Sequence, residues 1–182
     1  MDRDRVLPAQ RLRFVQDDLS GEAVRALVER HLHGMRASSP PESVHAFDIE
    51  KLRAPGVVFW SAWVDEPAAI AAADRNRGDA ASVGSDLAAM GALKRLDATR
   101  GEIKSMRVAD AYLGCGIGRA MLEHIVAQAR AIGLTSLWLE TGTTPDFAPA
   151  RQLYRSAGFV DCGPFEDYGP DPFSAFMTRA LR

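Results

Sequence analysis

The fold of this sequence is decided by the glycine-rich stretch Leu113-Gly114-Cys115-Gly116-Ile117-Gly118. It follows an expected strand and directly precedes the most regularly amphipathic segment of the chain, residues 117–132. Glycines at alternate positions before a helix leave backbone N–H groups directed into an open loop, where the helix dipole favours negative charge. The stretch therefore predicts a phosphate cradle, with a tight turn that holds no ligand as the alternative.

The helix after this loop is predicted from its hydrophobic periodicity. Apolar residues recur every three or four positions and so share one face, whereas charged residues lie opposite. The apolar set is Ile117, Met121, Leu122, Ile125, Val126, Ala129 and Ile132. Gly133 is expected to end the helix.

The rest of the chain divides into short strands and helices. Alternating, β-branched or aromatic patterns predict strands over 11–16, 57–64, 87–96, 101–108, 134–140, 159–161 and 173–181. Helices are expected between the N-cap Ser20 and Ser38, over 46–53, and over 147–157 with Gly158 as its C-terminal stop. These elements predict an α/β fold.

The length of 182 residues corresponds to one domain. We expect that domain over 11–182, preceded by a polar tail at 1–10. Residues 65–85 contain Ala, Asp, Gly and Ser and have almost no large apolar side chain to bury. A flexible hairpin insertion within the domain is therefore expected there, with a short Ala-rich helix as the alternative.

Composition excludes several classes of protein. The 22 basic and 24 acidic residues give a net charge of −2, so no global positive field favours nucleic acid or an anionic membrane as partner. Two cysteines cannot form a disulfide framework, and no Cys/His cluster has zinc spacing, so no metal is expected. No apolar run is long enough to span a membrane, and the first residues lack a signal-peptide core, so a cytoplasmic location is expected.

Two familiar nucleotide-binding motifs do not match the loop. A dinucleotide-binding motif requires a third glycine or alanine, but that position is Arg119 counted from Gly114 and Met121 counted from Gly116. The preceding residues 102–108 alternate charged and apolar side chains, unlike a parallel strand buried on both faces. No Gly-Lys-Ser/Thr follows, which excludes a Walker A loop.

The loop resembles the strand-to-helix motif Arg/Gln-x-x-Gly-x-Gly/Ala of the GNAT superfamily of N-acetyltransferases. A second GNAT motif, Ala-x-x-Leu-Tyr-x-x-x-Gly-Phe, is matched by residues 150–159. The order of elements from residue 11 onward fits the family as well. Two residues depart from the pattern: Leu113 replaces the usual Arg or Gln, and Phe147 stands where many members have Asn.

The resemblance implies a mixed, mostly antiparallel sheet that is flanked by helices and splayed at the glycine loop. It also implies an acetyl-CoA-dependent N-acetyltransferase that moves the acetyl group to a primary amine of a small molecule or peptide. In this family the transfer is direct, within a ternary complex. A homodimer is compatible with the resemblance.

Acetyl-CoA is expected to lie against the loop and the strand before it. The family holds phosphates mainly through backbone N–H groups, and the matching strand offers backbone hydrogen bonds to the pantetheine arm. The resemblance therefore assigns to acetyl-CoA binding Met106, Val108, Leu113, Gly114, Cys115, Gly116, Ile117, Gly118 and Arg119.

Two side chains are the candidates for proton transfer. Tyr154 occupies the position of the usual general acid of the family, which protonates the departing sulfur. Glu102 lies where histone-acetylating members have their general base. A solvated carboxylate paired with Lys104 is the alternative for Glu102, and Glu140 is the rival base at the end of the next strand.

The acceptor amine is expected near the polar stretch from His31 to His45, because family members build the acceptor pocket there. The candidates for this pocket are His31, Arg36, Glu42, His45, Trp60 and Glu140. Two alternatives to the enzyme stay open: a GNAT-like module that binds CoA without catalysis, and a nicotinamide-dependent oxidoreductase.

Overall fold

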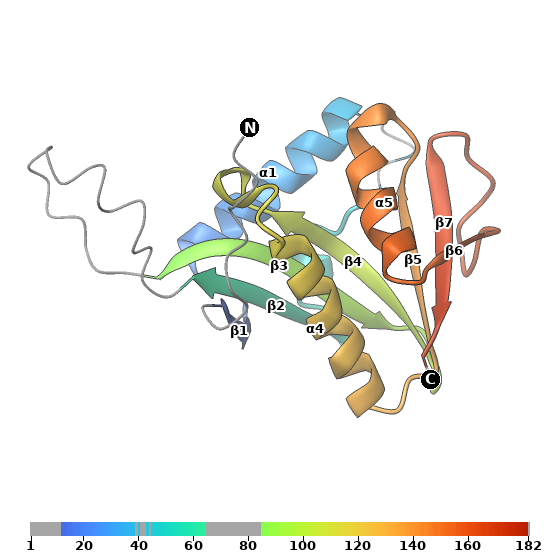
Figure 1. Cartoon of the computed structure of the whole chain (residues 1–182), viewed down its shortest axis with the longest axis horizontal. Helices are drawn as coiled ribbons and strands as arrows, with labels where there is room; N and C mark the ends of the chain where they lie inside the picture. Colours follow the sequence, from blue (N-terminus) through green and yellow to red (C-terminus); the bar gives the residue numbers. More distant parts are fainter. Residues whose placement is uncertain (1–11, 39, 41–42, 44, 65–84, 182) are drawn as a thin grey trace, which may run out of the picture.

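One seven-stranded sheet organises the chain (Figure 1). The computed structural model describes residues 12–38, 40, 43, 45–64 and 85–181, so the predicted tail at 1–10 and all but Ser85 of the predicted insertion lie outside the described residues. The strand order is β1-β2-β3-β4-β5-β7-β6. All neighbours are antiparallel except β4 and β5, which confirms the predicted mixed sheet. The strands are β1 (Leu12–Gln16), β2 (Val57–Val64), β3 (Asp86–Arg95), β4 (Arg100–Val108), β5 (Ser136–Gly142), β6 (Val160–Cys162) and β7 (Ser174–Ala180).

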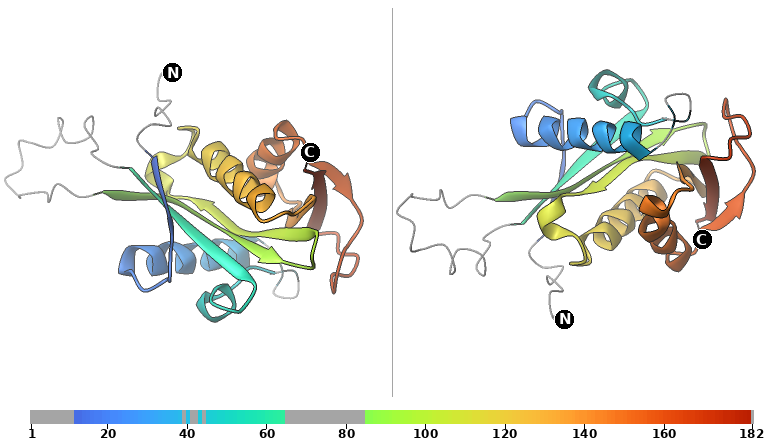
Figure 2. Two further views of the ribbon diagram at one scale, coloured as in Figure 1. Left: turned by 90° about the horizontal axis from the view of Figure 1, so that it is seen from below. Right: turned by 90° about the horizontal axis from the view of Figure 1, so that it is seen from above.

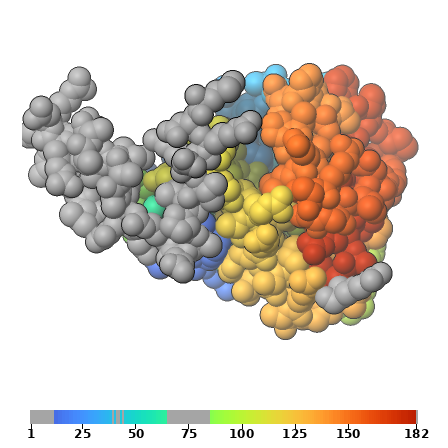
Figure 3. Space-filling model, in the orientation of Figure 1, coloured from blue at the N-terminus to red at the C-terminus, as the bar shows by residue number. Residues whose placement is uncertain are grey.

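Helices cover both faces of the sheet, as Figure 2 shows. One face carries α1 (Glu22–Ser38) and the short α2 (Ile49–Leu52). The opposite face carries α4 (Ile117–Ala131) and α5 (Ala148–Ser156). These two helices, in yellow and orange, form much of the surface seen in Figure 3. Two 3-10 turns, η3 (Asp110–Tyr112) and η4 (Pro145–Phe147), precede α4 and α5.

The predicted apolar face of α4 is confirmed for six of its seven residues, which are buried against the sheet. Full burial of one such aliphatic side chain stabilises the fold by about 1.5–3 kcal/mol. Ile132 is the exception, because it is the C-cap residue and is exposed. Gly133 follows with a φ of 84°, which only glycine adopts without strain, and it ends the helix as predicted.

On the other face, α1 begins at Glu22 rather than directly after Ser20. The backbone N–H of Arg25 donates to the carbonyl of Gly21. Gly21, and not Ser20, is therefore the N-cap residue of the helix. Val24 and Leu19 are both buried in the same apolar cluster, together with Leu27 and Val28. These side chains place the helix firmly on the sheet.

The sheet opens at its centre because β4 and β5 diverge. Their parallel pairing covers only Arg100–Ile103 against Ser136–Leu139. Beyond it the register of β4 against β3 also shifts: Lys104 pairs with Ala92, whereas three residues later Arg107 pairs with Met90, two residues away. β4 therefore has one extra residue at this point, a β-bulge.

Candidate active site

The glycine loop borders a groove of about 640 Å³. Gly114 and Gly116 have φ values of 77° and 81°, and a Cβ added to either glycine would meet nothing within 4 Å. Both glycines therefore have an open side, which is the space that a phosphate approaching the backbone needs. The first turn of α4 adds the N–H groups of Ile117, Gly118 and Arg119, which precede the first hydrogen bond of the helix, from Ala120 to Gly116, and receive no side-chain cap.

Of the residues predicted to bind acetyl-CoA, eight line this groove, namely Met106, Val108, Leu113, Gly114, Gly116, Ile117, Gly118 and Arg119. Cys115 does not line it, and that prediction is corrected. Its thiol is buried in the core under α4, and its backbone N–H already donates to the carbonyl of Tyr112 at 3.3 Å. The Cys115 thiol and the Cys115 backbone N–H are therefore both directed into the protein and not toward the groove.

The other wall of the groove comes from residues that the sequence did not indicate. Arg107 lines the groove and donates to the Asp110 carboxylate at 2.9 Å. Ser38 at the end of α1 donates its hydroxyl to Asp146 in η4 at 3.0 Å, which links elements that are far apart in the chain. Nothing in the local sequence marks these contacts, because they depend on how α1 crosses the sheet.

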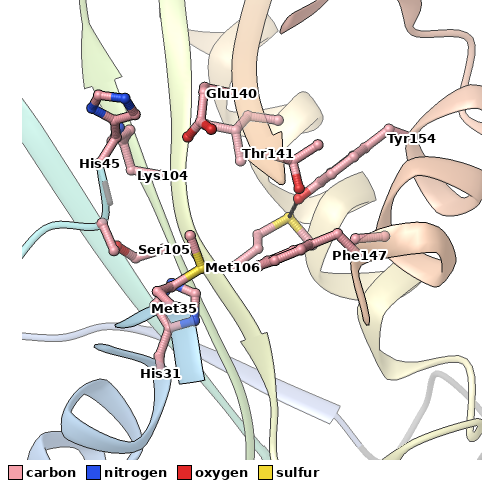
Figure 4. Close-up of a pocket in the computed structure, with 13 residues that line it drawn as sticks. His31, Met35, His45, Lys104, Ser105, Met106, Glu140, Thr141, Phe147 and Tyr154 are labelled. Atoms are coloured by element: carbon pink, nitrogen blue, oxygen red, sulfur yellow. Dashed lines mark hydrogen bonds between the residues drawn. The ribbon is translucent and has the colours of Figure 1, made fainter. Parts of the chain in front are cut away.

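A smaller cavity of about 80 Å³ adjoins the groove between the diverging strands (Figure 4). It includes two of the predicted acceptor residues that come from separate elements, His31 and His45, and a third, Glu140, from β5. The groove and the cavity share six lining residues: His31, Met35, Met106, Phe147, Ala150 and Tyr154. A ligand that fills the groove would therefore reach the cavity at these residues.

Tyr154 lies at the junction of groove and cavity. Its side chain extends from α5, is 7% exposed, and its hydroxyl lies 3.9 Å from the Met106 sulfur. Burial raises the pKa of Tyr154 well above its usual value, and the nearby Glu140 adds to this effect. The hydroxyl therefore stays protonated at neutral pH and can act as a proton donor.

Glu140 brings a carboxylate to the same cavity (Figure 4). Burial raises its pKa above the usual value, while a hydrogen bond with Ser174 and the charge of Lys104 act in the opposite direction. A raised pKa makes a carboxylate a better proton acceptor near neutral pH.

Glu102 does not line the cavity, and it is not a solvated carboxylate. It is 1% exposed, and its Oε1 accepts hydrogen bonds from the Lys104 ammonium at 3.2 Å and from the Tyr168 hydroxyl at 2.5 Å. Lys104 also donates to the Tyr168 oxygen at 2.6 Å. The pairing with Lys104 is thus confirmed, but it occurs in a buried cluster of three residues.

The two histidines of the cavity are held neutral. Burial is the main cause that lowers the pKa of His31 to about 4, and the charges of Arg107 and Lys104 are the smaller causes. Burial likewise lowers the pKa of His45, with a further contribution from Lys104 and an opposing one from Asp171. Neither imidazole supplies a positive charge to the cavity at neutral pH.

Two of the predicted acceptor residues that the structure describes lie away from the cavity. Trp60 is buried in the core on the α4 side, edge-on to His124 at 5.4 Å between ring centroids, so that prediction is wrong. Its strand alternates between the two faces, and the pleat turns Trp60 away from the cavity. Arg36 is exposed on α1 and lines neither the groove nor the cavity, which corrects that prediction too. Glu42 lies outside the described residues.

Several cavity residues were missed by the sequence analysis. Lys104 was noted only as a partner of Glu102, and Ser105 and Thr141 were not noted at all. The Phe147 ring fills the space beside Gly142 that a Cβ would otherwise occupy. The spacing of Lys104 two residues after Glu102 was the one available signal.

The described part of the chain contains no group of three or more His, Cys, Asp or Glu side chains arranged to hold a metal ion. Nor does any helix in the described ranges have the length and apolar character needed to cross a membrane.

Comparisons with known proteins agree with this geometry. The model of the Acetyltransferase (GNAT) family matches residues 26–159. The uncharacterized N-acetyltransferase YsnE of Bacillus subtilis (strain 168) is 47% identical over 165 residues, which cover 91% of this chain and 97% of YsnE. An IAA acetyltransferase of Azospirillum brasilense is 36% identical over 160 residues, which cover 88% of this chain and 92% of that protein.

Solved structures share the fold. An acetyltransferase from Streptococcus agalactiae 2603 matches with a TM-score of 0.65 at 18% identity and covers 94% of this chain and 99% of its own. The ribosomal-protein-S18-alanine N-acetyltransferase from Escherichia coli matches with a TM-score of 0.58 at 17% identity, over 93% and 94% of the two chains. With both sequence motifs, the splayed sheet and the family match over residues 26–159, the chain belongs to the GNAT family of acetyltransferases.

Proposed function

We propose that this chain transfers an acetyl group directly from acetyl-CoA to the primary amine of a small molecule or peptide in a ternary complex. The observation that carries the proposal is the position of Tyr154, whose side chain borders both the groove and the cavity. A donor in the groove and an acceptor in the cavity would meet beside this hydroxyl. Direct transfer requires such a meeting point.

The groove has the features that acetyl-CoA requires. The open sides of Gly114 and Gly116 and the first turn of α4 offer backbone N–H groups for the pyrophosphate. At the bulge, Ser105 and Met106 have no register partner in β3, and β5 has already diverged. We expect their backbone groups to form hydrogen bonds with the pantetheine arm. Acetyl-CoA supplies the acetyl group as an activated thioester.

In this proposal the chain moves two protons. Glu140 takes the proton from the acceptor amine, directly or through a water molecule, because it is the carboxylate that lines the cavity and its pKa is raised. Tyr154 gives its hydroxyl proton to the sulfur that leaves. Glu102 is less well placed to take this proton, because two donors occupy its Oε1 and it lies outside the cavity lining.

The proposal is tested by thermal shift and by thiol release from acetyl-CoA with a panel of amines. Saturation at 100 times the dissociation constant stabilises the folded chain by about 2.7 kcal/mol, a readily measured shift. Steady thiol release with at least one amine is the expected result. Stabilisation by acetyl-CoA without turnover would contradict the enzyme and favour a CoA-binding module. Stabilisation by NAD instead would contradict acetyl-CoA as the ligand.

A further inference from the structure

We infer that the acceptor carries a carboxylate as well as its amine, and that Lys104 and Ser105 bind this carboxylate. The inference rests on the proposed function, and it names the substrate class that the cavity selects. Lys104 and Ser105 are neighbours on β4, and Figure 4 shows them on one side of the cavity, with Glu140, Thr141 and Tyr154 on the other.

One N–H donor of the Lys104 ammonium is not used within the described part of the chain. An ammonium carries three N–H donors. Glu102 and Tyr168 accept two of them, and no third acceptor lies within hydrogen-bond distance among the described residues. The Phe47 and Tyr168 rings, 4.7 Å and 5.3 Å from the nitrogen, help to hold the ammonium in place. The remaining N–H is therefore available to a ligand in the cavity that Lys104 lines.

The Ser105 hydroxyl is a second unused donor. Ser105 is 8% exposed, lines the cavity, and its hydroxyl has no hydrogen-bond partner within the described ranges. Its φ of 52° is unusual for a residue other than glycine and arises at the bulge of β4. A buried polar group without a partner is costly, so its persistence points to a ligand that completes the bond.

A cationic donor and a neutral donor on neighbouring residues of the cavity lining match the chemistry of a carboxylate, which accepts hydrogen bonds on two oxygens. The local charge also limits which anion can bind. Glu102 already balances Lys104, and Glu140 adds a further carboxylate across the cavity, so a dianionic phosphate would be repelled. A zwitterion instead presents its amine to Glu140 and Tyr154 and its single negative charge to Lys104 and Ser105.

The size of the cavity agrees with a small amino acid. One water needs about 10–15 Å³ of such space. The cavity of about 80 Å³ therefore holds roughly five to eight water-sized groups. This is enough for the head of an amino acid, with the rest of the molecule directed toward the groove or solvent.

The test compares amino acids with their own amides and decarboxylated amines as acceptors in the thiol-release assay. Values of kcat/KM are calculated per concentration of neutral amine, because an amide lowers the pKa of its neighbouring amine. We expect the acid to exceed the amide by about 10- to 100-fold, the effect of a hydrogen bond to a charged group. Equal values would overturn the inference and leave the proposed function standing.

Two variants connect the preference to these donors. Ser105→Ala should raise KM for the acid by about ten-fold, leave KM for the decarboxylated amine unchanged, and cause no loss of thermal stability, because the lost hydroxyl has no partner. Glu102→Gln/Lys104→Met removes the ammonium without leaving a buried charge and should abolish the preference. Thr141→Val, on the opposite wall, is the matched control and should change acid and amide alike.

An acid preference that survives unchanged in Ser105→Ala would overturn the role of the Ser105 hydroxyl, and one that survives in the double variant would overturn the role of Lys104. If no amine is acetylated and acetyl-CoA does not bind, the proposed function and this inference both fall.

Discussion

Lys104→Met tests the energetics of the buried cluster formed by Glu102, Lys104 and Tyr168. The ammonium lies 3.2 Å from the Glu102 Oε1, and the two side chains are 5% and 2% exposed. Removing one partner of such a pair leaves an uncompensated buried charge and costs about 3–5 kcal/mol. Tyr168 still donates to Glu102, so we expect the lower end of this range, about 3 kcal/mol.

The double variant Glu102→Gln/Lys104→Met separates charge from packing. The Gln amide oxygen can still accept the Tyr168 hydroxyl, and no charge remains buried. We therefore expect a loss of only about 1 kcal/mol relative to the original chain, the cost of an ordinary hydrogen bond. Glu102→Gln alone should be more destabilising than the double variant, because it leaves the ammonium without its counter-ion.

Urea unfolding at pH 7 of all four proteins gives the coupling energy between the two residues. The expected coupling is at least about 2 kcal/mol, since the single losses should greatly exceed the double loss. Strictly additive losses would refute the reasoning. They would mean that Glu102 and Lys104 do not compensate each other, whatever the distance between them.

Two further changes test the groove and the base. Gly116→Val should strongly weaken acetyl-CoA binding. Its control is Gly133→Val, which has a similar φ of 84° and the same open space, so it should cause similar strain but leave acetyl-CoA binding intact. Equal affinities of the two variants for acetyl-CoA would show that the phosphates do not bind at Gly116. Glu140→Gln should lower turnover by about 10²- to 10⁴-fold. The pKa of Glu140 is raised in the folded state, so ionisation of this carboxyl lowers the stability of the fold at a pH above the raised pKa. Below the unfolded-state pKa of about 4.3 the carboxyl is protonated in both states, and this destabilisation is absent. Glu140→Gln should therefore melt at a higher temperature than the original chain at pH 8 and at the same temperature below pH 4. Full activity of Glu140→Gln would refute the role of Glu140 as the base.

Much of the fold could be predicted from local pattern. The apolar residues of α4 are set by helical periodicity, and Gly116 and Gly133 mark its two ends because both have positive φ. The turn between β3 and β4 is also local, because Asp97 accepts a hydrogen bond from the backbone N–H of Arg100, three residues later. Such elements depend on residues close together in sequence, so the sequence alone contains the information.

The centre of the site could not be predicted in this way. The divergence of β4 and β5 after Ile103 is a property of two strands, and neither strand has a sequence signal for it. Ser105 adopts a positive φ although serine has no special preference for that region. Both features arise from packing between distant segments.

The alternation of Glu102 and Lys104 with apolar residues also gave a misleading signal. It suggested a solvated strand face, but Tyr168, 66 residues away from Glu102, lies over that face together with Phe47. The aromatic residues of β2 were misleading in a different way. Trp60 was expected to line the acceptor pocket, but it packs into the core under α4. Which face of a strand is covered is decided by segments far away in the sequence.

The measurement that tests the central claim most directly is the turnover of Tyr154→Phe together with its affinity for acetyl-CoA. The variant keeps the ring and its contact with Phe159 and loses only the hydroxyl that borders both groove and cavity. We predict an unchanged dissociation constant for acetyl-CoA and a fall in kcat of about 100-fold. Full activity would contradict the claim, because another donor would then protonate the leaving sulfur.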